Sequence, residues 1–309
     1  MSRNPFFCSD LSRAVGEKTF GTASTGEVWL LVEYPFAWAS KALEGSNLSP
    51  PIKSHLADSL KAVPRSRLLF IKQGPLCGER VAAFVVRCRE REPFVVRLDL
   101  GDYRELLDLD LAQVAAGNLP AGAELSREPL YLVCTHGRRD KCCAKYGMAL
   151  FKSLHALHGD AVWQSSHVGG DRFAANLVCF PHGLFYAHVT EDEGRRAVGE
   201  YGAGRLVLEK YRGRACYRHV VQAAEFFARA ESGLVGLRDL RAWGCEPAGE
   251  DRWRVRFLAP RDGRAFDVTL SRRLSEFRNF VTCQSEEERR VPQFQLEEFK
   301  ETAYRRQGV

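Results

Sequence analysis

Residues 129–166, "PLYLVCTHGRRDKCCAKYGMALFKSLHALHGDAVWQSS", contain the pattern that decides the fold. The apolar run "PLYLVC" (129–134) is typical of a buried strand. In "AKYGMALFKSLHALH" (144–158) apolar residues recur at three- and four-residue steps, which predicts a helix. A second strand is predicted at "DAVWQSS" (160–166). A right-handed crossover should make the two strands parallel.

Two more strands are predicted after this unit, at 175–180 and 184–189. A Pro-His-Gly turn separates them, which suits a hairpin. Strand, helix, strand and then a hairpin is the layout of a thioredoxin-like α/β unit.

The same order of elements is predicted earlier in the chain. A strand at 27–34 precedes a helix at 49–63, and the next three strands are predicted at 66–72, 80–88 and 93–100. A helical stretch at 102–117 links the two segments. We therefore expect an α/β fold with tandem thioredoxin-like units.

Residues beyond 190 predict a small C-terminal α+β domain. The sequence indicates helices near 190–201 and 217–230, followed by a hairpin between "WRVRFLAP" (253–260) and "RAFDVTL" (264–270). No chemical motif is evident in this part of the chain.

Composition is that of a globular protein: 45% of the 309 residues are hydrophobic and 27% are charged. The N-terminus has no apolar segment typical of a secretory signal, and no run approaches the roughly 18 apolar residues of a membrane-spanning helix. These features predict a cytoplasmic protein that does not contact membrane. The net charge is +6, but Arg residues are scattered among acids, which argues against a nucleic-acid partner.

Ten cysteines are present, and a cytoplasmic chain is not expected to join them in disulfides. Seven stand alone in the sequence and are interpreted as small hydrophobic residues. Three cluster within ten residues: Cys134, Cys142 and Cys143.

Cys134 ends the strand at 129–134, and Cys143 lies at the start of the following helix. His167 comes directly after the strand at 160–166. Because the carboxyl ends of parallel strands lie side by side, Cys134 and His167 should meet there. Thiolate and imidazole suit zinc or an iron–sulfur cluster. Gly169 and Gly170 would let backbone N–H groups approach a bulky or anionic ligand.

A thiol-based oxidoreductase of thioredoxin type is the alternative, with Cys134, Cys142 or Cys143 as nucleophile. Arg139 and the helix N-terminus would lower the pKa of that thiol, although no Cys-x-x-Cys motif is present. A zinc-stabilised interaction module is a third hypothesis. In the simplest alternative, His167 is a turn residue and the thiols fill a core.

"CTHGRRDKCCAKYG" (134–147) and "SSHVGGDRFAANLVCFPHGLFYAHV" (165–189) closely resemble the sucrase/ferredoxin-like family. So do "WLLVEYPFAWASKAL" (29–43) and "YRGRACY…VQAAE" (211–225), and the resemblance covers most of residues 8 to 230. It implies a thioredoxin-like ferredoxin with one [2Fe-2S] cluster, held by two Cys and two His.

Mapped on this chain, the resemblance selects Cys134, Cys143 and His167 as ligands. The position of the second His holds Asp171, which we expect to be the fourth ligand because it replaces that position one for one. Asp171 could instead orient His167. The reserve candidates for the fourth ligand are Cys142, His136 and His182.

The function implied is that of a one-electron carrier serving a redox partner protein that the sequence does not identify. Arg139 and Arg172 would offset the negative charge of the cluster and present a docking surface. A hydrolase is not expected, because glycosidases need two carboxylic acids across a sugar cleft, and this site offers Asp171 with Asp140 nearby.

Three domains are expected in all. Residues 1–125 form an N-terminal thioredoxin-like unit without the cluster motif, residues 126–215 form the unit that carries it, and residues 216–309 form the C-terminal α+β domain.

Overall fold

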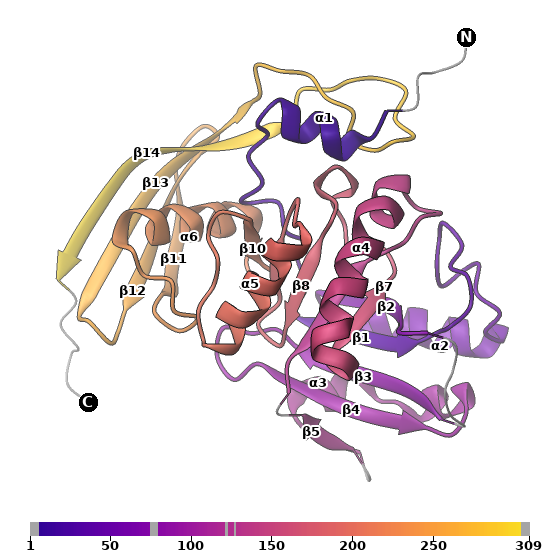
Figure 1. The fold of residues 1–309 in the computed structure, drawn as a ribbon. Helices are drawn as coiled ribbons and strands as arrows, with labels where there is room; N and C mark the ends of the chain where they lie inside the picture. The colour runs from indigo at the N-terminus through magenta and orange to yellow at the C-terminus, as the bar shows by residue number, and fades with distance from the viewer. Residues whose placement is uncertain (1–5, 75–79, 121–122, 127, 304–309) are drawn as a thin grey trace.

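Two β-sheets organise the protein, which is described by a computed structural model covering residues 6–74, 80–120, 123–126 and 128–303. One is a ten-stranded mixed sheet, and the other is a four-stranded antiparallel sheet (Figure 1). The predicted α/β class is confirmed. Of the ten cysteines, Cys77 lies outside the described residues.

The N-terminal half of the large sheet follows the predicted order. Strands β1 (Val28–Glu33) and β2 (Ser66–Lys72) are parallel, and helix α2 (Pro50–Ala62) connects them. Strand β3 (Val81–Arg87) then pairs antiparallel with β1, and β4 (Phe94–Leu100) pairs antiparallel with β3. Ser49 occupies the predicted N-cap position of α2, although its side chain makes no capping hydrogen bond.

The second half repeats this arrangement. Strands β6 (Leu130–Cys134) and β7 (Val162–Ser165) are parallel, and α4 (Lys141–His158) connects them. Strand β8 (Leu177–Phe180) pairs antiparallel with β6, and β9 (Leu184–Tyr186) pairs antiparallel with β8. The parallel pairing expected from a right-handed crossover is thus confirmed in both halves.

Strands β2 and β7 join the halves into one sheet. They pair antiparallel, with Ile71 opposite Ser165. The backbone N–H of Ser166 donates to the carbonyl of Phe70 at 2.7 Å, and the Ser166 hydroxyl accepts from the Phe70 N–H at 3.0 Å. The strand order is therefore β10-β9-β8-β6-β7-β2-β1-β3-β4-β5, with β5 (Glu124–Ser126) and β10 (Tyr211–Arg214) at the edges.

The C-terminal sheet contains β11 (Arg241–Gly249), β12 (Arg252–Ala259), β13 (Arg264–Leu274) and β14 (Pro292–Ala303). Helix α6 (His219–Ser232) packs on it, and its apolar core includes Phe257 and Phe266. The predicted hairpin between β12 and β13 is confirmed. The remaining helices are α1 (Cys8–Ala14), η1 (Tyr103–Asp108), α3 (Leu111–Ala116), η2 (Gly159–Ala161), η3 (Asp171–Phe173) and α5 (Glu191–Gly202).

Helix α1 lies far from the strand that follows it in sequence. It packs on η3 and lies beside the loop between β13 and β14 (Figure 1). Thus α1 and the β13–β14 loop, which are far apart in the sequence, meet next to the start of α4.

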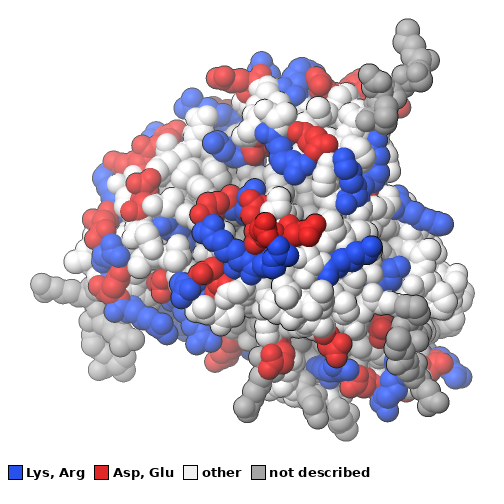
Figure 2. Space-filling view, viewed as in Figure 1, with Lys and Arg blue, Asp and Glu red and all other residues white. Residues whose placement is uncertain are grey.

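Charged side chains of both signs are interspersed on the face seen in Figure 2, as the scattered Arg residues of the sequence indicate. Among the described residues, no helix combines the length and apolar character that crossing a membrane requires.

Candidate metal centre

The carboxyl ends of β6 and β7 create the site. Cys134, the last residue of β6, lies opposite Ser165, the last residue of β7. Helix α4 then passes close to the end of β6, because Gly147 has no side chain: a Cβ there would collide with the Cys134 carbonyl oxygen. This close approach brings Cys143, in the first turn of α4, next to Cys134.

Three predicted ligands meet at this point. One ligand atom from each of Cys134, Cys143 and His167 lies within 4.8 Å of the other two. Cys134 and Cys143 are 1% and 0% exposed, whereas the His167 side chain is 22% exposed. The two thiols are therefore enclosed, and the imidazole lies at the edge of the site that faces solvent.

Asp171 lies beside His167 at the start of η3. Its Oδ1 is 3.1 Å from His167 Nδ1 and 3.7 Å from Cys143 Sγ. The imidazole and the carboxylate are close but not aligned for a hydrogen bond, so the buried Nδ1 has no hydrogen-bond partner. A buried polar atom normally has one. The orphaned Nδ1 and the adjacent carboxylate oxygen are therefore suited to share a cation.

The electrostatics of the site favour one thiolate in the absence of a cation. A hydrogen bond from Cys143 and the neighbouring His167 hold the pKa of the Cys134 thiol well below its usual range. The same contact with Cys134 raises the pKa of Cys143, and burial raises the pKa of Asp171. A metal cation would offset this crowding of acidic groups.

The loop between His167 and Asp171 depends on its two glycines. Gly169 and Gly170 have φ of +91° and +82°, a region that side chains with Cβ rarely adopt. A Cβ on Gly169 would collide with Ser24 Oγ, and one on Gly170 would lie within 2.9 Å of three atoms of the Arg212 guanidinium. The proposed approach of their N–H groups to a ligand stays a prediction.

Arg212 holds this loop and was not singled out from the sequence. Its side chain is buried, and Nη1 donates to the carbonyl of Gly169 at 3.0 Å and to Asn176 Oδ1 at 2.7 Å. Asn176 in turn donates to the carbonyl of Gly170 at 2.9 Å. The sequence did contain one indication of a role for Arg212, because this residue belongs to the "YRGRACY" segment (211–217) that carries the family resemblance.

The two reserve histidines have other partners. His136 accepts the N–H of His167 on Nδ1 at 3.1 Å, and its Nε2 lies 2.8 Å from the carbonyl of Ala39. His182 contacts the Tyr201 hydroxyl at 2.7 Å and lies in the turn after β8, at the end of the sheet opposite Cys134. These contacts leave neither imidazole directed at the thiols.

The two predicted docking arginines differ in their surroundings. Arg172 Nε donates to Glu17 Oε1 at 2.7 Å, and its guanidinium also covers the Phe173 ring. Arg139 lies near enough to Asp171 to lower the pKa of that carboxyl, against the larger effect of burial. The backbone carbonyl of Arg139 accepts a hydrogen bond from Gln284 at 2.9 Å.

Cys142 belongs to a different group from the other two cysteines of its motif. It lies with Asp140 from the same motif and with two residues that sequence analysis left apart from the motif, Cys8 and Cys283. Cys8 belongs to the apolar core and Cys283 packs against it, as small hydrophobic residues would, but the two are not isolated, because their sulfurs contact each other and Cys142. Cys8 lies 132 residues from Asp140 and 275 residues from Cys283 in the sequence, so the spacing of nearby residues could not predict these contacts.

Both groups could hold a metal ion, because each combines thiols with imidazole or carboxylate in largely buried positions. Comparison with protein families found that the model described as sucrase/ferredoxin-like matches residues 19–213. Comparison with curated proteins and with solved structures found no match.

Proposed function

Because the chain belongs to the sucrase/ferredoxin-like family, we propose that it is a one-electron carrier that binds one [2Fe-2S] cluster. The observation that carries the proposal is the meeting of two buried cysteine sulfurs with the imidazole of His167, whose Nδ1 has no hydrogen-bond partner. Thiolates are the ligands common to iron–sulfur clusters, and histidine replaces two of them in some two-iron centres.

In this proposal Cys134 and Cys143 hold one iron, and His167 and Asp171 hold the other. The donor set fits, because it supplies two enclosed thiolates, a nitrogen without a partner and an adjacent carboxylate oxygen. The carboxylate is the hardest of these ligands and distinguishes this chain from relatives with two histidines. The cluster supplies the ability to accept and release one electron.

Protein groups around the site would tune and protect it. Burial of Cys134 and Cys143 keeps water from the sulfurs, and the contact with His136 fixes the backbone of His167. The partly exposed imidazole of His167 is the natural point of approach for a redox partner protein. Arg139 and Arg172 would contribute positive charge to the docking surface.

We also propose that each half of the large sheet is a thioredoxin-like unit. What supports this is the repeated strand order, β4-β3-β1-β2 and β9-β8-β6-β7, in which the first two strands of each half are parallel. The corresponding domains are residues 1–125, 126–215 and 216–309. The N-terminal unit, which lacks the motif, would provide a scaffold or partner surface, and the protein would reside in the cytoplasm.

A thiol-based oxidoreductase is favoured by one observation, the lowered pKa of Cys134. Reactive thiols must also be accessible to a substrate, however, and Cys134 is only 1% exposed. Electron transfer imposes no such requirement on the ligands, so it is the better-supported function.

The test is the metal content and absorption spectrum of protein purified without air. We expect about two iron and two acid-labile sulfide per chain, with visible absorption that bleaches by one electron on reduction. A colourless protein with zinc bound by Cys134, Cys143 and His167 would instead indicate an interaction module. A metal-free protein with a rapidly alkylated thiol would indicate the oxidoreductase.

A further inference from the structure

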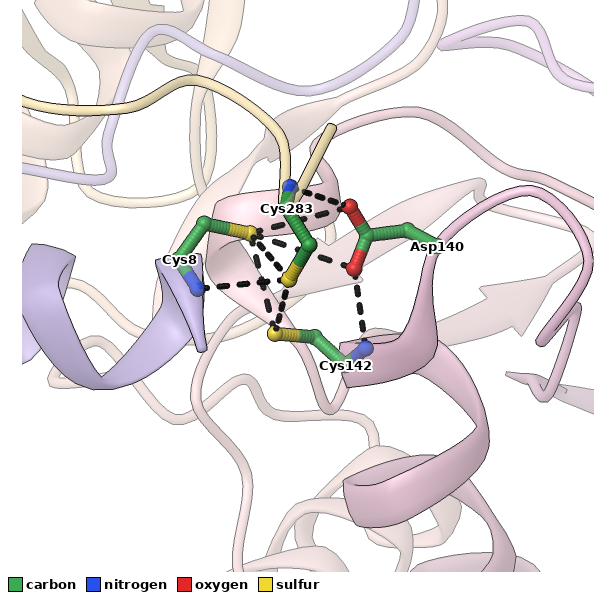
Figure 3. A group of neighbouring side chains, drawn as sticks. All are labelled: Cys8, Asp140, Cys142 and Cys283. Atoms are coloured by element: carbon green, nitrogen blue, oxygen red, sulfur yellow. Dashed lines mark hydrogen bonds between the residues drawn. The ribbon is translucent and has the colours of Figure 1, made fainter. Parts of the chain in front are cut away.

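A buried group of four side chains joins three segments that are far apart in the chain: Cys8, Asp140, Cys142 and Cys283 (Figure 3). Cys8 begins α1, Asp140 and Cys142 are at the start of α4, and Cys283 lies between β13 and β14. One ligand atom from each lies within 4.8 Å of all the others. We propose that this group is a second metal site, which binds one zinc ion through three thiolates and one carboxylate.

The three sulfurs form a nearly equilateral triangle. Cys142 Sγ lies 3.6 Å from Cys8 Sγ and 3.3 Å from Cys283 Sγ, and the third edge is 3.5 Å. Zinc–sulfur bonds of about 2.3 Å in tetrahedral geometry separate the sulfurs by about 3.8 Å. A slight opening of the triangle would therefore admit the ion. A disulfide would pair two sulfurs and leave the third without a role.

Asp140 completes a tetrahedral set. Both of its carboxylate oxygens lie 3.8–3.9 Å from Cys8 Sγ. Its Oδ1 accepts the N–H of Cys142 at 2.8 Å, and its Oδ2 accepts the N–H of Cys283 at 2.7 Å. These bonds orient the carboxylate, and each oxygen keeps a lone pair for a metal.

Two further backbone groups point at the sulfurs. The N–H of Ser9 donates to Cys142 Sγ at 3.5 Å, and the N–H of Cys8 donates to Cys283 Sγ at 3.4 Å. Hydrogen bonds of this kind favour a thiolate over a thiol. The backbone of α1 thus directs two N–H groups at these sulfurs, an arrangement that suits metal-bound thiolates.

Zinc is the ion that this donor set suits best. Magnesium and calcium prefer oxygen ligands, so three soft thiolates disfavour both ions. A complete set of four protein ligands is typical of structural rather than catalytic zinc. Cys8, Asp140 and Cys142 are buried, while Cys283 is half-buried and gives access from solvent. The inference does not depend on the [2Fe-2S] proposal, because the two groups share no ligand.

The ion would fasten α1 and the β13–β14 loop to the first turn of α4. Present contacts between α1, the β13–β14 loop and α4 include the stacked rings of Phe6 and Phe280, 4.5 Å apart, and the hydrogen bond from Tyr146 to Asp10 at 2.6 Å. Such contacts are weak near solvent, and zinc would add a strong cross-link. Since α1 also packs on η3, the cross-link would steady the segment that contains Asp171.

The experiment measures zinc, iron and sulfide together in full-length protein expressed with both metals supplied. We expect about one zinc per chain in the wild type. Cys8→Ser and Cys283→Ser should each lower zinc to below about a tenth of that value, with iron unchanged, because loss of one thiolate removes most of the affinity. Cys245→Ser, at a half-buried cysteine on β11 outside both groups, is the matched control and should keep its zinc.

A second measurement does not need the variants to fold. Zinc is removed from the wild type with a chelator, and cobalt is added; three thiolates should give intense near-ultraviolet absorption and the visible bands of a tetrahedral ion. A wild type without zinc and without that cobalt spectrum would overturn the proposal, as would full zinc in both Cys8→Ser and Cys283→Ser. Zinc without iron would contradict the [2Fe-2S] proposal, and it would sustain this site only if Cys8→Ser and Cys283→Ser lose that zinc. Iron without zinc would contradict this site and leave the [2Fe-2S] proposal standing.

Discussion

Cys142 and Cys143 are consecutive residues, yet their sulfurs point into different groups. Cys142 Sγ lies 3.3 Å from Cys283 Sγ, whereas Cys143 Sγ lies 3.7 Å from an oxygen of Asp171. Helix geometry explains the separation, because successive side chains on an α-helix diverge by about 100°. In the two proposals the vicinal pair would therefore supply one ligand to each site, and the two cysteines would not compete for the same metal.

Serine variants of the pair should separate the two metals. Cys143→Ser should abolish cluster binding, as should Cys134→Ser, because each removes a thiolate that holds iron. Cys142→Ser should keep most of its iron and lose zinc. Iron, sulfide and zinc per chain are the measurements, and equal loss of iron in the Cys142 and Cys143 variants would show that the assignment of the pair is wrong.

His167→Ala should lose or destabilise the cluster, because it removes the imidazole that meets Cys134 and Cys143. His167→Cys should retain it with a lower reduction potential, since a thiolate adds negative charge where imidazole is neutral. Visible absorption and a redox titration are the measurements. A fully loaded Ala variant with an unchanged spectrum would remove His167 from the ligand set.

Gly170→Ala should destabilise the fold and the cluster together. A Cβ would lie 2.5–2.9 Å from the Arg212 guanidinium, at a φ of +82°. We expect a loss of about 1–3 kcal/mol in the free energy of unfolding. The control is Gly199→Ala in α5, where a Cβ meets no atom within 4 Å and helix propensity predicts a gain of up to about 1 kcal/mol. Urea unfolding measures both, and equal stabilities would refute the expected clash.

Glu225→Gln should weaken the junction between β10 and α6. Glu225 is buried between Arg214 and Arg229, at 3.4 Å and 2.9 Å. Burial alone would raise the pKa of Glu225, but the two guanidinium groups outweigh it and hold the pKa below its usual value. Removing the charge leaves two buried cations uncompensated, which should cost about 3–5 kcal/mol.

The pH dependence of this variant follows from the lowered pKa. The stabilisation by Glu225 is complete above the pKa of the unfolded chain, about 4.3, and is lost as the pH falls through the lower pKa of the folded state. The difference in unfolding free energy between wild type and Glu225→Gln should therefore be constant near neutrality and shrink below about pH 4. A difference that shrinks between pH 5 and 8 would contradict this assignment.

The β6–α4–β7 unit was predictable because its signals are local. Apolar runs and helical spacing within 129–166 specify the elements, and the parallel crossover then places Cys134 and His167 at the same edge of the sheet. The antiparallel pairing of β2 with β7, which merges the two halves, has no such local signal. Any two strand edges of suitable length could have paired, and only the folded chain shows which did.

The group proposed to bind zinc could not be predicted from local sequence patterns. Cys8 and Cys283 are 275 residues apart, and neither has a neighbouring cysteine or histidine at ligand spacing. Their meeting depends on the packing of α1 and the β13–β14 loop against the start of α4, which is a property of the tertiary structure. Arg212 is an intermediate case: its residue type gave no hint of its role, but the segment around it carried the family resemblance.

Asp171 allows the sharpest test of the cluster ligands. An oxidised two-iron core has a formal charge of plus two, which two thiolates and two neutral imidazoles bring to zero. A carboxylate in place of one imidazole leaves the oxidised site with one net negative charge. Added negative charge disfavours the gain of an electron, so the reduction potential should lie below that of a site with two Cys and two His.

Asp171→His should therefore raise the reduction potential. It should also steepen the dependence of the potential on pH, because two imidazoles rather than one could take up a proton on reduction. Asp171→Asn is the matched control: it removes the charge at nearly constant size and adds no titrating group, so a cluster that survives in it should show a higher potential with the shallow slope of the wild type. Redox titrations between about pH 6 and 9 cover the range in which a ligand imidazole titrates. Identical potentials and slopes in all three proteins would mean that Asp171 is not a ligand, and that its carboxylate only orients His167 across the 3.1 Å that separates them.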